Sequence, residues 1–339
     1  MNNIVNVLIT HSFPEALITT LREVSPRLRL TVHPARKPED IPPEEWARAE
    51  VLYTERVLPA PEQAPNLKWV QFHLAGIEHA LDHPLMSRPE LIVTSLSGAA
   101  SSQMAEYALM MLLALGHRLP DLFANQMKAE WPKDKWERFS PKELRGSTVG
   151  IVGYGSIGRQ IARLLQPFGA TVLAAKRDVM HPEDQEYTPE GMGDPKGELF
   201  KRLYPTQALR SMFRECDFVV VCVPLTPETR NLITKEELDA LPLGACLVDI
   251  SRGGVVDHAA LLEALQSRKL SGAALDVFPE EPLPPTSPLW KMPNVLITPH
   301  ISGDSPHYNE RAVALFAENL NRYLAGLPLY NRYDPNRGY

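Results

Sequence analysis

The hydrophobic residues of the first hundred positions fall into short runs separated by a segment of helical periodicity. Val5–Ile9 and Trp69–Phe72 are compact apolar runs, and residues 29–32 and 51–53 are similar. Residues 14–24, which follow the first run, place apolar side chains every three to four positions, as an amphipathic helix does. The pattern predicts a first series of alternating β-strands and helices.

A second series of apolar runs begins at residue 148. Its members are hydrophobic throughout rather than alternating: Thr148–Val152, Thr171–Ala175 and residues 218–223, 246–250, 273–278 and 295–298. Such runs are typical of parallel strands covered by helices on both faces. A long helix is predicted at residues 101–119, where Ser101 or Ser102 can cap it, and a final helix at residues 305–324. The fold class predicted is α/β, with two doubly wound domains built on parallel sheets.

Length, composition and charge exclude several classes of protein. The 339 residues suffice for two domains, and 44% hydrophobic with 22% charged residues is typical of a globular chain. The chain has 35 Lys and Arg residues and 41 Asp and Glu residues, which gives a net charge of −6. Because it also has no dense basic cluster, no nucleic-acid partner is expected. The longest apolar run, residues 107–115, is too short for a membrane span, and the first residues lack a basic signal-peptide start. We therefore expect a cytoplasmic protein without a membrane partner.

The cysteines indicate neither a disulfide framework nor a metal site. Cys216, Cys222 and Cys246 are odd in number and show no C-x-x-C spacing, so they are interpreted as buried thiols near strands.

Residues 178–205 interrupt the alternation of strands and helices. They contain four prolines and three glycines with almost no apolar periodicity, which predicts a long loop. Two interpretations stay open for this loop. It either touches the mouth of a binding site, or serves as surface decoration or a subunit contact.

A glycine motif directly follows the first strand of the second series. Gly153-Tyr154-Gly155-Ser156-Ile157-Gly158 fits G-x-G-x-x-G and stands between Thr148–Val152 and a predicted helix at residues 159–166. In this motif the first glycine permits a tight turn, the second lets a pyrophosphate approach the backbone, and the third allows close packing of helix and strand. The three glycines, with Ser156 and Ile157 at the helix N-terminus, are the predicted contacts of a dinucleotide.

The end of the next strand indicates which dinucleotide is bound. An acidic residue there would accept the ribose 2′-OH of NAD(H), but this chain has Lys176 and Arg177. Two cations can neutralise a 2′-phosphate, so NADP(H) is favoured and NAD(H) is possible. Asp178, the next residue, could still turn toward the ribose.

Three late segments combine charged residues with glycine or proline directly after predicted strands. They are Asp249-Ile250-Ser251-Arg252-Gly253-Gly254, Leu275-Asp276-Val277-Phe278-Pro279-Glu280-Glu281-Pro282-Leu283 and Thr298-Pro299-His300-Ile301-Ser302-Gly303. Each should emerge at the carboxyl edge of the sheet, where open α/β sheets bind ligands. An arginine, a glutamate and a histidine are thereby predicted to meet at the nicotinamide.

At these segments the chain resembles the D-isomer-specific 2-hydroxyacid dehydrogenases, a family that includes glyoxylate/hydroxypyruvate reductases and phosphoglycerate dehydrogenases. Ala75-Gly76-Ile77, Ala105-Glu106-Tyr107 and Val223-Pro224-Leu225-Thr226-Pro227-Glu228-Thr229 belong to the same resemblance. It implies NAD(P)H-dependent reduction of a small 2-keto acid to a D-2-hydroxy acid, or the reverse oxidation. Phosphoglycerate dehydrogenase, or a non-catalytic nucleotide-sensing protein like the corepressors built on this fold, are the alternatives.

The resemblance also implies roles for individual residues. Arg252 would bind the substrate carboxylate and polarise the carbonyl, His300 would deliver the proton, and Glu281 would be the carboxylate partner of His300. The backbone N–H groups of Ala75, Gly76 and Ile77 would bind the substrate carboxylate. Further cofactor contacts are implied for Val223, Pro224, Thr229, Ile250, Ser251, Arg252, Asp276, His300 and Gly303, with Asp276 at the nicotinamide carboxamide.

These positions lead to a predicted domain organisation. Residues 1–99 and 302–332 form a discontinuous substrate-binding domain, into which a Rossmann-type dinucleotide-binding domain, residues 100–301, is inserted.

The helix at 101–119 has a broad apolar face that includes Tyr107, Met104, Met110 and Met111. Because the family pairs through this region, a homodimer is expected.

Overall fold

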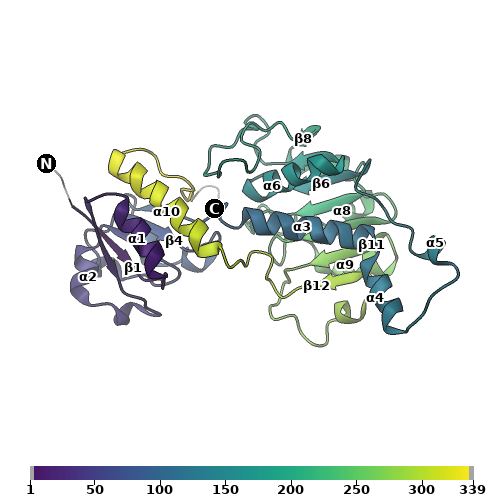
Figure 1. Ribbon diagram of the computed structural model, residues 1–339, viewed down its shortest axis with the longest axis horizontal. Helices are drawn as coiled ribbons and strands as arrows, with labels where there is room; N and C mark the ends of the chain where they lie inside the picture. The colour runs from purple at the N-terminus through teal and green to yellow at the C-terminus, as the bar shows by residue number, and fades with distance from the viewer. Residues whose placement is uncertain (1–3, 336–339) are drawn as a thin grey trace. The chain divides into compact units, whose positions relative to one another are not determined.

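The computed structural model describes residues 4–335, and these form two compact units (Figure 1). Unit 1 contains the residues up to Ala100 together with those from Ser305 onward, and unit 2 contains Ser101–Asp304. Each unit is built on its own parallel sheet. The predicted class, an α/β protein with two doubly wound parallel sheets, is therefore confirmed.

Unit 1 has a five-stranded sheet in the order β2-β1-β3-β4-β5. Its elements are β1 (Val5–Ile9), α1 (Glu15–Glu23), β2 (Leu28–Val32), α2 (Pro43–Arg48), β3 (Val51–Thr54), β4 (Trp69–Phe72), β5 (Ile92–Thr94) and α10 (Tyr308–Ala325). Val7 of β1 pairs with Leu30 of β2 on one side and with Val51 of β3 on the other. The strand order thus reverses between β1 and β3, and ligands of such sheets bind beyond the carboxyl ends of the strands at that point.

Both faces of this sheet are buried, because neighbouring residues of a strand point to opposite sides. Leu52 belongs to a cluster with Trp46 of α2, whereas the next residue, Tyr53, belongs to a cluster with Ile18 of α1 and Phe316 of α10. Helix α10 is therefore part of the core of unit 1, although it follows unit 2 in the sequence.

Unit 2 has a seven-stranded parallel sheet in the order β12-β11-β10-β9-β6-β7-β8. Its elements are α3 (Ser101–Gly116), α4 (Leu119–Met127), α5 (Lys135–Arg138), β6 (Thr148–Val152), α6 (Ser156–Leu165), β7 (Thr171–Ala175), β8 (Arg202–Tyr204), α7 (Leu209–Phe213), β9 (Phe218–Val221), α8 (Lys235–Ala240), β10 (Ala245–Asp249), α9 (His258–Gln266), β11 (Leu270–Leu275) and β12 (Val295–Ile297). The order reverses at β6, which pairs with both β7 and β9. The glycine motif directly follows β6, so it lies at the switch point of this sheet.

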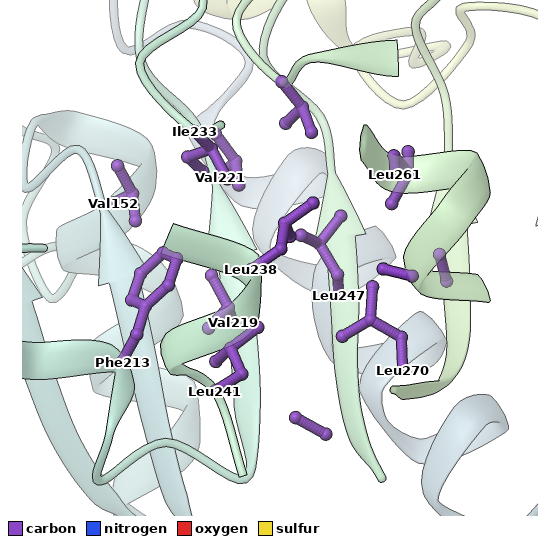
Figure 2. Close-up of a cluster of buried hydrophobic side chains, with 14 of the residues drawn as sticks. Val152, Phe213, Val219, Val221, Ile233, Leu238, Leu241, Leu247, Leu261 and Leu270 are labelled. Atoms are coloured by element: carbon purple, nitrogen blue, oxygen red, sulfur yellow. The ribbon is translucent and has the colours of Figure 1, made fainter. Parts of the chain in front are cut away.

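A large core cluster lies between one face of this sheet and helices α7, α8 and α9 (Figure 2). Val152, Val219 and Leu247 contribute from the strands, and Phe213 and Leu238 from the helices. All five side chains are at most 1% exposed. Burying side chains of this size stabilises the unit by about 1.5–3 kcal/mol each, which fixes the strands whose ends carry the candidate site.

Helix α3 packs along α6 and contacts β10 and β11. Met104 and Met111 are buried, Tyr107 is half-buried, and only Met110 of the four residues named for subunit pairing is exposed. The expectation that this helix presents a broad apolar face to a partner is therefore wrong. The apolar face of α3 is covered by the chain's own sheet and helices.

The bounds of several elements differ from the pattern-based prediction. The helix predicted at 101–119 ends at Gly116, and Arg118, with a φ of 55°, separates it from α4. The strands β9, β10, β11 and β12 end one to three residues before the apolar runs do. The last apolar residues of those runs leave the hydrogen-bonded ladder and enter loops at the carboxyl edge.

Two strands, β5 and β8, were not predicted. Each has only three residues, too few to show a period of two. Strand β8 lies inside the predicted loop at 178–205, and the remainder of that stretch contains neither helix nor strand. Among residues 4–335, no helix is both long and apolar enough to cross a membrane.

Candidate active site

The glycine motif forms the turn between β6 and α6. Gly153 has a φ of 107°, a conformation that residues with a Cβ rarely adopt. A Cβ on Gly158 would stand 2.1 Å from the carbonyl oxygen of Gly153, so only glycine lets the helix approach the turn this closely. The fold itself therefore requires glycine at both positions.

Gly155 is different, because the fold does not require a glycine there. Its φ of −93° and ψ of −160° are open to most residues. Apart from its chain neighbours, no heavy atom of the described residues lies within 4 Å of the place where a Cβ would stand. Gly155 is exposed and leads into the first turn of α6, where Ser156 and Ile157 are half-buried. N–H groups of a helix's first turn have no intrahelical acceptor and attract anions, so the open position fits a pyrophosphate.

Two cations follow the end of β7. Lys176 is half-buried, and its Nζ donates a hydrogen bond to the carbonyl oxygen of His181 at 2.7 Å. Burial and the charge of Arg159 lower the pKa of Lys176. Arg177, next in sequence, is exposed. The sheet thus places two basic side chains where dinucleotide-binding folds contact the ribose.

The loop after β9 lies against the glycine turn. Cys222 Sγ donates to the carbonyl oxygen of Gly153 at 3.1 Å, and Val223 and Pro224 beyond it are half-buried. Thr229 is buried, and its Oγ1 donates to the carbonyl oxygen of Pro224 at 2.6 Å. Thr229 therefore stabilises the conformation of this loop, while its contact with a cofactor stays a prediction.

Arg252 lies on a loop that is attached to a buried carboxyl group. Asp249, the last residue of β10, accepts hydrogen bonds from Ser251 N at 3.0 Å and from Ser251 Oγ at 2.5 Å. Burial raises the pKa of Asp249 to about 7, although these two hydrogen bonds act in the opposite direction. A Cβ on Gly253 would stand 1.9 Å from the carbonyl oxygen of Phe278, so this loop lies directly against the segment after β11.

His300 and Glu281 form a hydrogen-bonded pair. His300 Nδ1 donates to Glu281 Oε2 at 2.7 Å, and Glu281 Oε1 accepts from Phe278 N at 2.9 Å. The side chains are 43% and 35% exposed, respectively, so solvent or a ligand can reach the imidazole. His300 has a φ of 51°, which is uncommon for a residue other than glycine and is frequent at functional sites.

Asp276 anchors the segment that carries His300. Its carboxylate is fully buried and accepts hydrogen bonds from Thr298 Oγ1 at 2.6 Å, Ile301 N at 2.9 Å and Ser302 N at 3.0 Å. The hydroxyl groups of Thr298 and Tyr107 are also within 2.6 Å of each other. The predicted contact of Asp276 with the nicotinamide carboxamide stays a prediction, and the anchoring role was not predicted.

The structure places the sequence-predicted residues as follows. Arg252, Glu281 and His300 lie on three loops of unit 2 that follow the adjacent strands β10, β11 and β12. Ile250 and Ser251 are buried, and the carbonyl oxygen of Gly303 accepts a hydrogen bond from Gln103 Nε2 at 2.5 Å. Ala75, Gly76 and Ile77 lie in unit 1, directly after β4. Among the described residues, no cluster of three or more His, Cys, Asp or Glu side chains could hold a metal ion.

Sequence reasoning gave no role to Asp249 or Arg159. An aspartate at the end of a buried strand, four residues before Gly253 and Gly254, is a signal that could have identified Asp249. Arg159 follows the last glycine of the motif and is only 1% exposed. Nothing in its sequence context distinguishes it from a solvated helix residue.

Comparison with known proteins extends these observations. The family model described as "D-isomer specific 2-hydroxyacid dehydrogenase, NAD binding domain" matches residues 109–302. A glyoxylate reductase of Thermococcus gammatolerans is 32% identical over 330 residues, which are 94% of this chain and 93% of that protein. A D-3-phosphoglycerate dehydrogenase of Methanocaldococcus jannaschii is 31% identical over 266 residues, 78% of this chain but only 47% of that protein.

The chain thus spans about half the length of that phosphoglycerate dehydrogenase. Among solved structures, a D-isomer specific 2-hydroxyacid dehydrogenase from Xanthobacter autotrophicus Py2 in complex with NADPH and MES has a TM-score of 0.79 at 31% identity, covering 99% of this chain and 100% of the other. The family model covers more than half of the chain, and the glyoxylate reductase match spans nearly all of it. This chain therefore belongs to the D-isomer-specific 2-hydroxyacid dehydrogenases, a family of NAD(P)-dependent oxidoreductases.

Proposed function

We propose that this protein reduces a small 2-keto acid to the D-2-hydroxy acid, or catalyses the reverse oxidation, and that glyoxylate or hydroxypyruvate is the keto acid. The observation that carries the proposal is the 2.7 Å contact between His300 Nδ1 and Glu281 Oε2. A histidine whose Nδ1 is fixed by a carboxylate has Nε2 as its nitrogen for proton transfer. The similarity to a glyoxylate reductase supports the choice of keto acid.

A nicotinamide dinucleotide held by unit 2 would supply the hydride in reduction or accept it in oxidation. Arg252 binds the substrate carboxylate and stabilises negative charge on the reacting oxygen. His300 gives a proton from Nε2 to that oxygen in reduction and takes it back in oxidation. Glu281 orients the imidazole and stabilises its charged form, and Ala75, Gly76 and Ile77 bind the substrate carboxylate through backbone N–H groups. Unit 1 is accordingly the substrate-binding domain, and unit 2 is the dinucleotide-binding domain.

NADP(H) is the proposed cofactor, with NAD(H) as the weaker alternative. Lys176 and Arg177 follow β7 where a dinucleotide fold contacts the ribose, and basic side chains form strong charge-assisted hydrogen bonds with a phosphate. The related structure from Xanthobacter autotrophicus was solved in complex with NADPH, which supports the same choice. Gly155, Ser156 and Ile157 would hold the pyrophosphate.

A substrate panel tests this function. Consumption of NADPH is followed by absorbance with glyoxylate, hydroxypyruvate and 3-phosphohydroxypyruvate, and the same reactions are repeated with NADH. We expect the first two acids to be reduced with NADPH, and we expect His300→Ala to lower turnover by far more than it weakens nucleotide binding. Preference for the phosphorylated acid would identify a phosphoglycerate dehydrogenase. Nucleotide binding without consumption of any keto acid would reject the enzyme in favour of a nucleotide-sensing protein.

A homodimer remains the proposed assembly, but on a different surface from the one predicted. Phe123 and Met127 of α4 are 54% and 86% exposed, and Trp131 and Trp136 beyond it are 86% and 80% exposed. Exposed apolar residues clustered in one stretch of chain are typical of a protein interface. Sedimentation at micromolar concentration should show a species of about twice 37.9 kDa, and Trp131→Glu should weaken it. A species of only 37.9 kDa would contradict the dimer.

A further inference from the structure

The connection between β7 and β8 is unusual for parallel neighbouring strands. Such strands are normally joined by a helix that covers the sheet, but here residues 178–201 join them without one. We name this stretch the 178–201 segment. Its position after Lys176 and Arg177 places its first turn beside the proposed ribose site.

The 178–201 segment is attached to the dinucleotide motif by buried polar contacts. Arg159, which directly follows the last glycine of the motif, donates from Nη1 to Asp194 O and from Nη2 to Pro182 O, both at 2.5 Å. Tyr154, which stands between the first two glycines of the motif, donates from its OH to Asp194 Oδ2 at 2.7 Å. The guanidinium of Arg159 also lies 4.9 Å from the Tyr154 ring centroid. The segment therefore has a defined position relative to the glycine turn.

The first turn of this segment holds the carboxylate of Asp178. Oδ2 of Asp178 accepts a hydrogen bond from His181 Nδ1 at 2.7 Å, and Oδ1 accepts from Met180 N at 3.0 Å. These two hydrogen bonds, that of His181 being the larger effect, lower the pKa of Asp178. The same turn contacts the neighbouring cation, because the carbonyl oxygen of His181 accepts from Lys176 Nζ at 2.7 Å.

A carboxylate at this place opposes NADP(H) in two ways. It can accept a hydrogen bond from the ribose 2′-OH of NAD(H), and its negative charge repels the 2′-phosphate of NADP(H). Both effects decrease when the carboxylate is hydrogen-bonded to a histidine and turned into its own loop. The contacts of Asp178 show this arrangement, although the sequence Lys176-Arg177-Asp178 contains cations and an acid side by side.

We propose that His181 is a specificity-determining residue that favours NADP(H) by holding the carboxylate of Asp178 away from the ribose. The inference rests on the proposed function, in which unit 2 binds a nicotinamide dinucleotide. The 178–201 segment thus belongs to the cofactor site and is more than surface decoration.

His181→Ala tests this inference selectively. The substitution removes the imidazole but keeps the carbonyl oxygen that Lys176 contacts. The pair is solvent-exposed, with side chains 73% and 48% exposed, so its loss should leave the fold intact. His307→Ala in α10's N-terminal region is a matched control, because His307 Nδ1 contacts Glu310 Oε2 at 2.8 Å with the same three-residue spacing, but in unit 1.

NADPH and NADH are titrated separately by nucleotide fluorescence. We expect His181→Ala to raise the Kd for NADPH by about tenfold and to leave that for NADH unchanged or lower. Adding Asp178→Asn should restore the NADPH affinity, since the neutral amide no longer repels the phosphate, and His307→Ala should change neither value.

Equal changes for both cofactors, or no rescue by Asp178→Asn, would overturn the inference. The proposed function has separate outcomes in the same titrations. A wild-type chain that binds NADH more tightly than NADPH would reject the cofactor preference, while the shift in ratio caused by His181→Ala would still decide the role of His181. A wild-type chain that binds neither cofactor would reject both.

Discussion

Replacing Gly155 by alanine should separate nucleotide binding from folding. The methyl group would meet no described heavy atom within 4 Å beyond its chain neighbours, and the backbone angles suit alanine. Alanine reduces the conformational entropy of the unfolded chain, which stabilises by about 0.4–1 kcal/mol. It is a poorer N-cap than glycine by a similar amount, about 1 kcal/mol. The free energy of unfolding should therefore change by less than about 1 kcal/mol.

Nucleotide affinity should change far more than stability. The methyl group would occupy the space through which a pyrophosphate reaches the first-turn N–H groups of α6. A hydrogen bond to a charged group contributes about 1.5–3 kcal/mol, so losing one should raise the Kd for NADPH by about 10- to 100-fold.

Gly158→Ala is the matched control, with the opposite expected result. Its methyl group would stand 2.1 Å from the carbonyl oxygen of Gly153, and overpacking of this kind costs about 1–3 kcal/mol or more. Urea unfolding followed by tryptophan fluorescence gives the stability of each variant, and NADPH titration gives the affinity. The reasoning would be refuted if Gly155→Ala bound NADPH as tightly as the wild type, or if it were destabilised as much as Gly158→Ala.

Three other predictions concern the chemistry, the cofactor and the pH dependence of stability. Glu281→Gln should lower kcat by about 100-fold or more at unchanged NADPH affinity, because the amide cannot stabilise a protonated His300. Steady-state kinetics and a parallel NADPH titration measure both quantities, and an unchanged kcat would contradict the proposed role of Glu281. Lys176→Asp with Arg177→Ala should raise the Kd for NADPH by about 100-fold, and an equal loss for NADH would assign both residues to the fold instead. Burial, with a contribution from a neighbouring histidine, lowers the pKa of His73 to about 3, so stability should be lost as pH falls below about 6.5, by up to about 1.4 kcal/mol per pH unit. His73→Gln should therefore reduce the difference in unfolding free energy between about pH 7 and about pH 5, and an unchanged difference would show that other groups cause it.

Most strands could be predicted because a buried parallel strand must be apolar along its whole length. Thr148–Val152 and Thr171–Ala175 have the bounds that the pattern predicts. The apolar pattern does not show where a strand leaves its ladder, so β9 ends at Val221 although apolar residues continue to Val223. Helix α3 shows the complementary limit, since an apolar helix face is equally suited to the chain's own sheet and to a partner.

The location of the candidate site in the sequence was predictable, because the segments that form it directly follow predicted strands. The segments that carry Arg252, Glu281 and His300 were located because charged residues next to glycine or proline after an apolar run mark the carboxyl edge, whereas the roles of the three residues came from the family resemblance and stay predictions. The contact between His181 and Asp178 was not predictable, because it depends on the path of a segment with no periodicity. The attachment of that segment to Arg159 depends on tertiary packing in the same way.

The loops that carry Arg252 and His300 are both anchored to buried carboxyl groups at strand ends. Asp249 and Asp276 stand at adjacent strand ends, since the backbone N–H of Asp276 donates to the carbonyl oxygen of Asp249 at 3.0 Å. Each buried carboxyl group accepts backbone N–H groups of the loop that carries Arg252 or of the loop that carries His300. Displacing either loop would leave a buried acceptor without its donors, which costs about 1–3 kcal/mol for each group. The positions of both loops therefore depend on the strand ends beneath them, so under the proposed mechanism a proton can leave His300 without displacing the loop of Arg252.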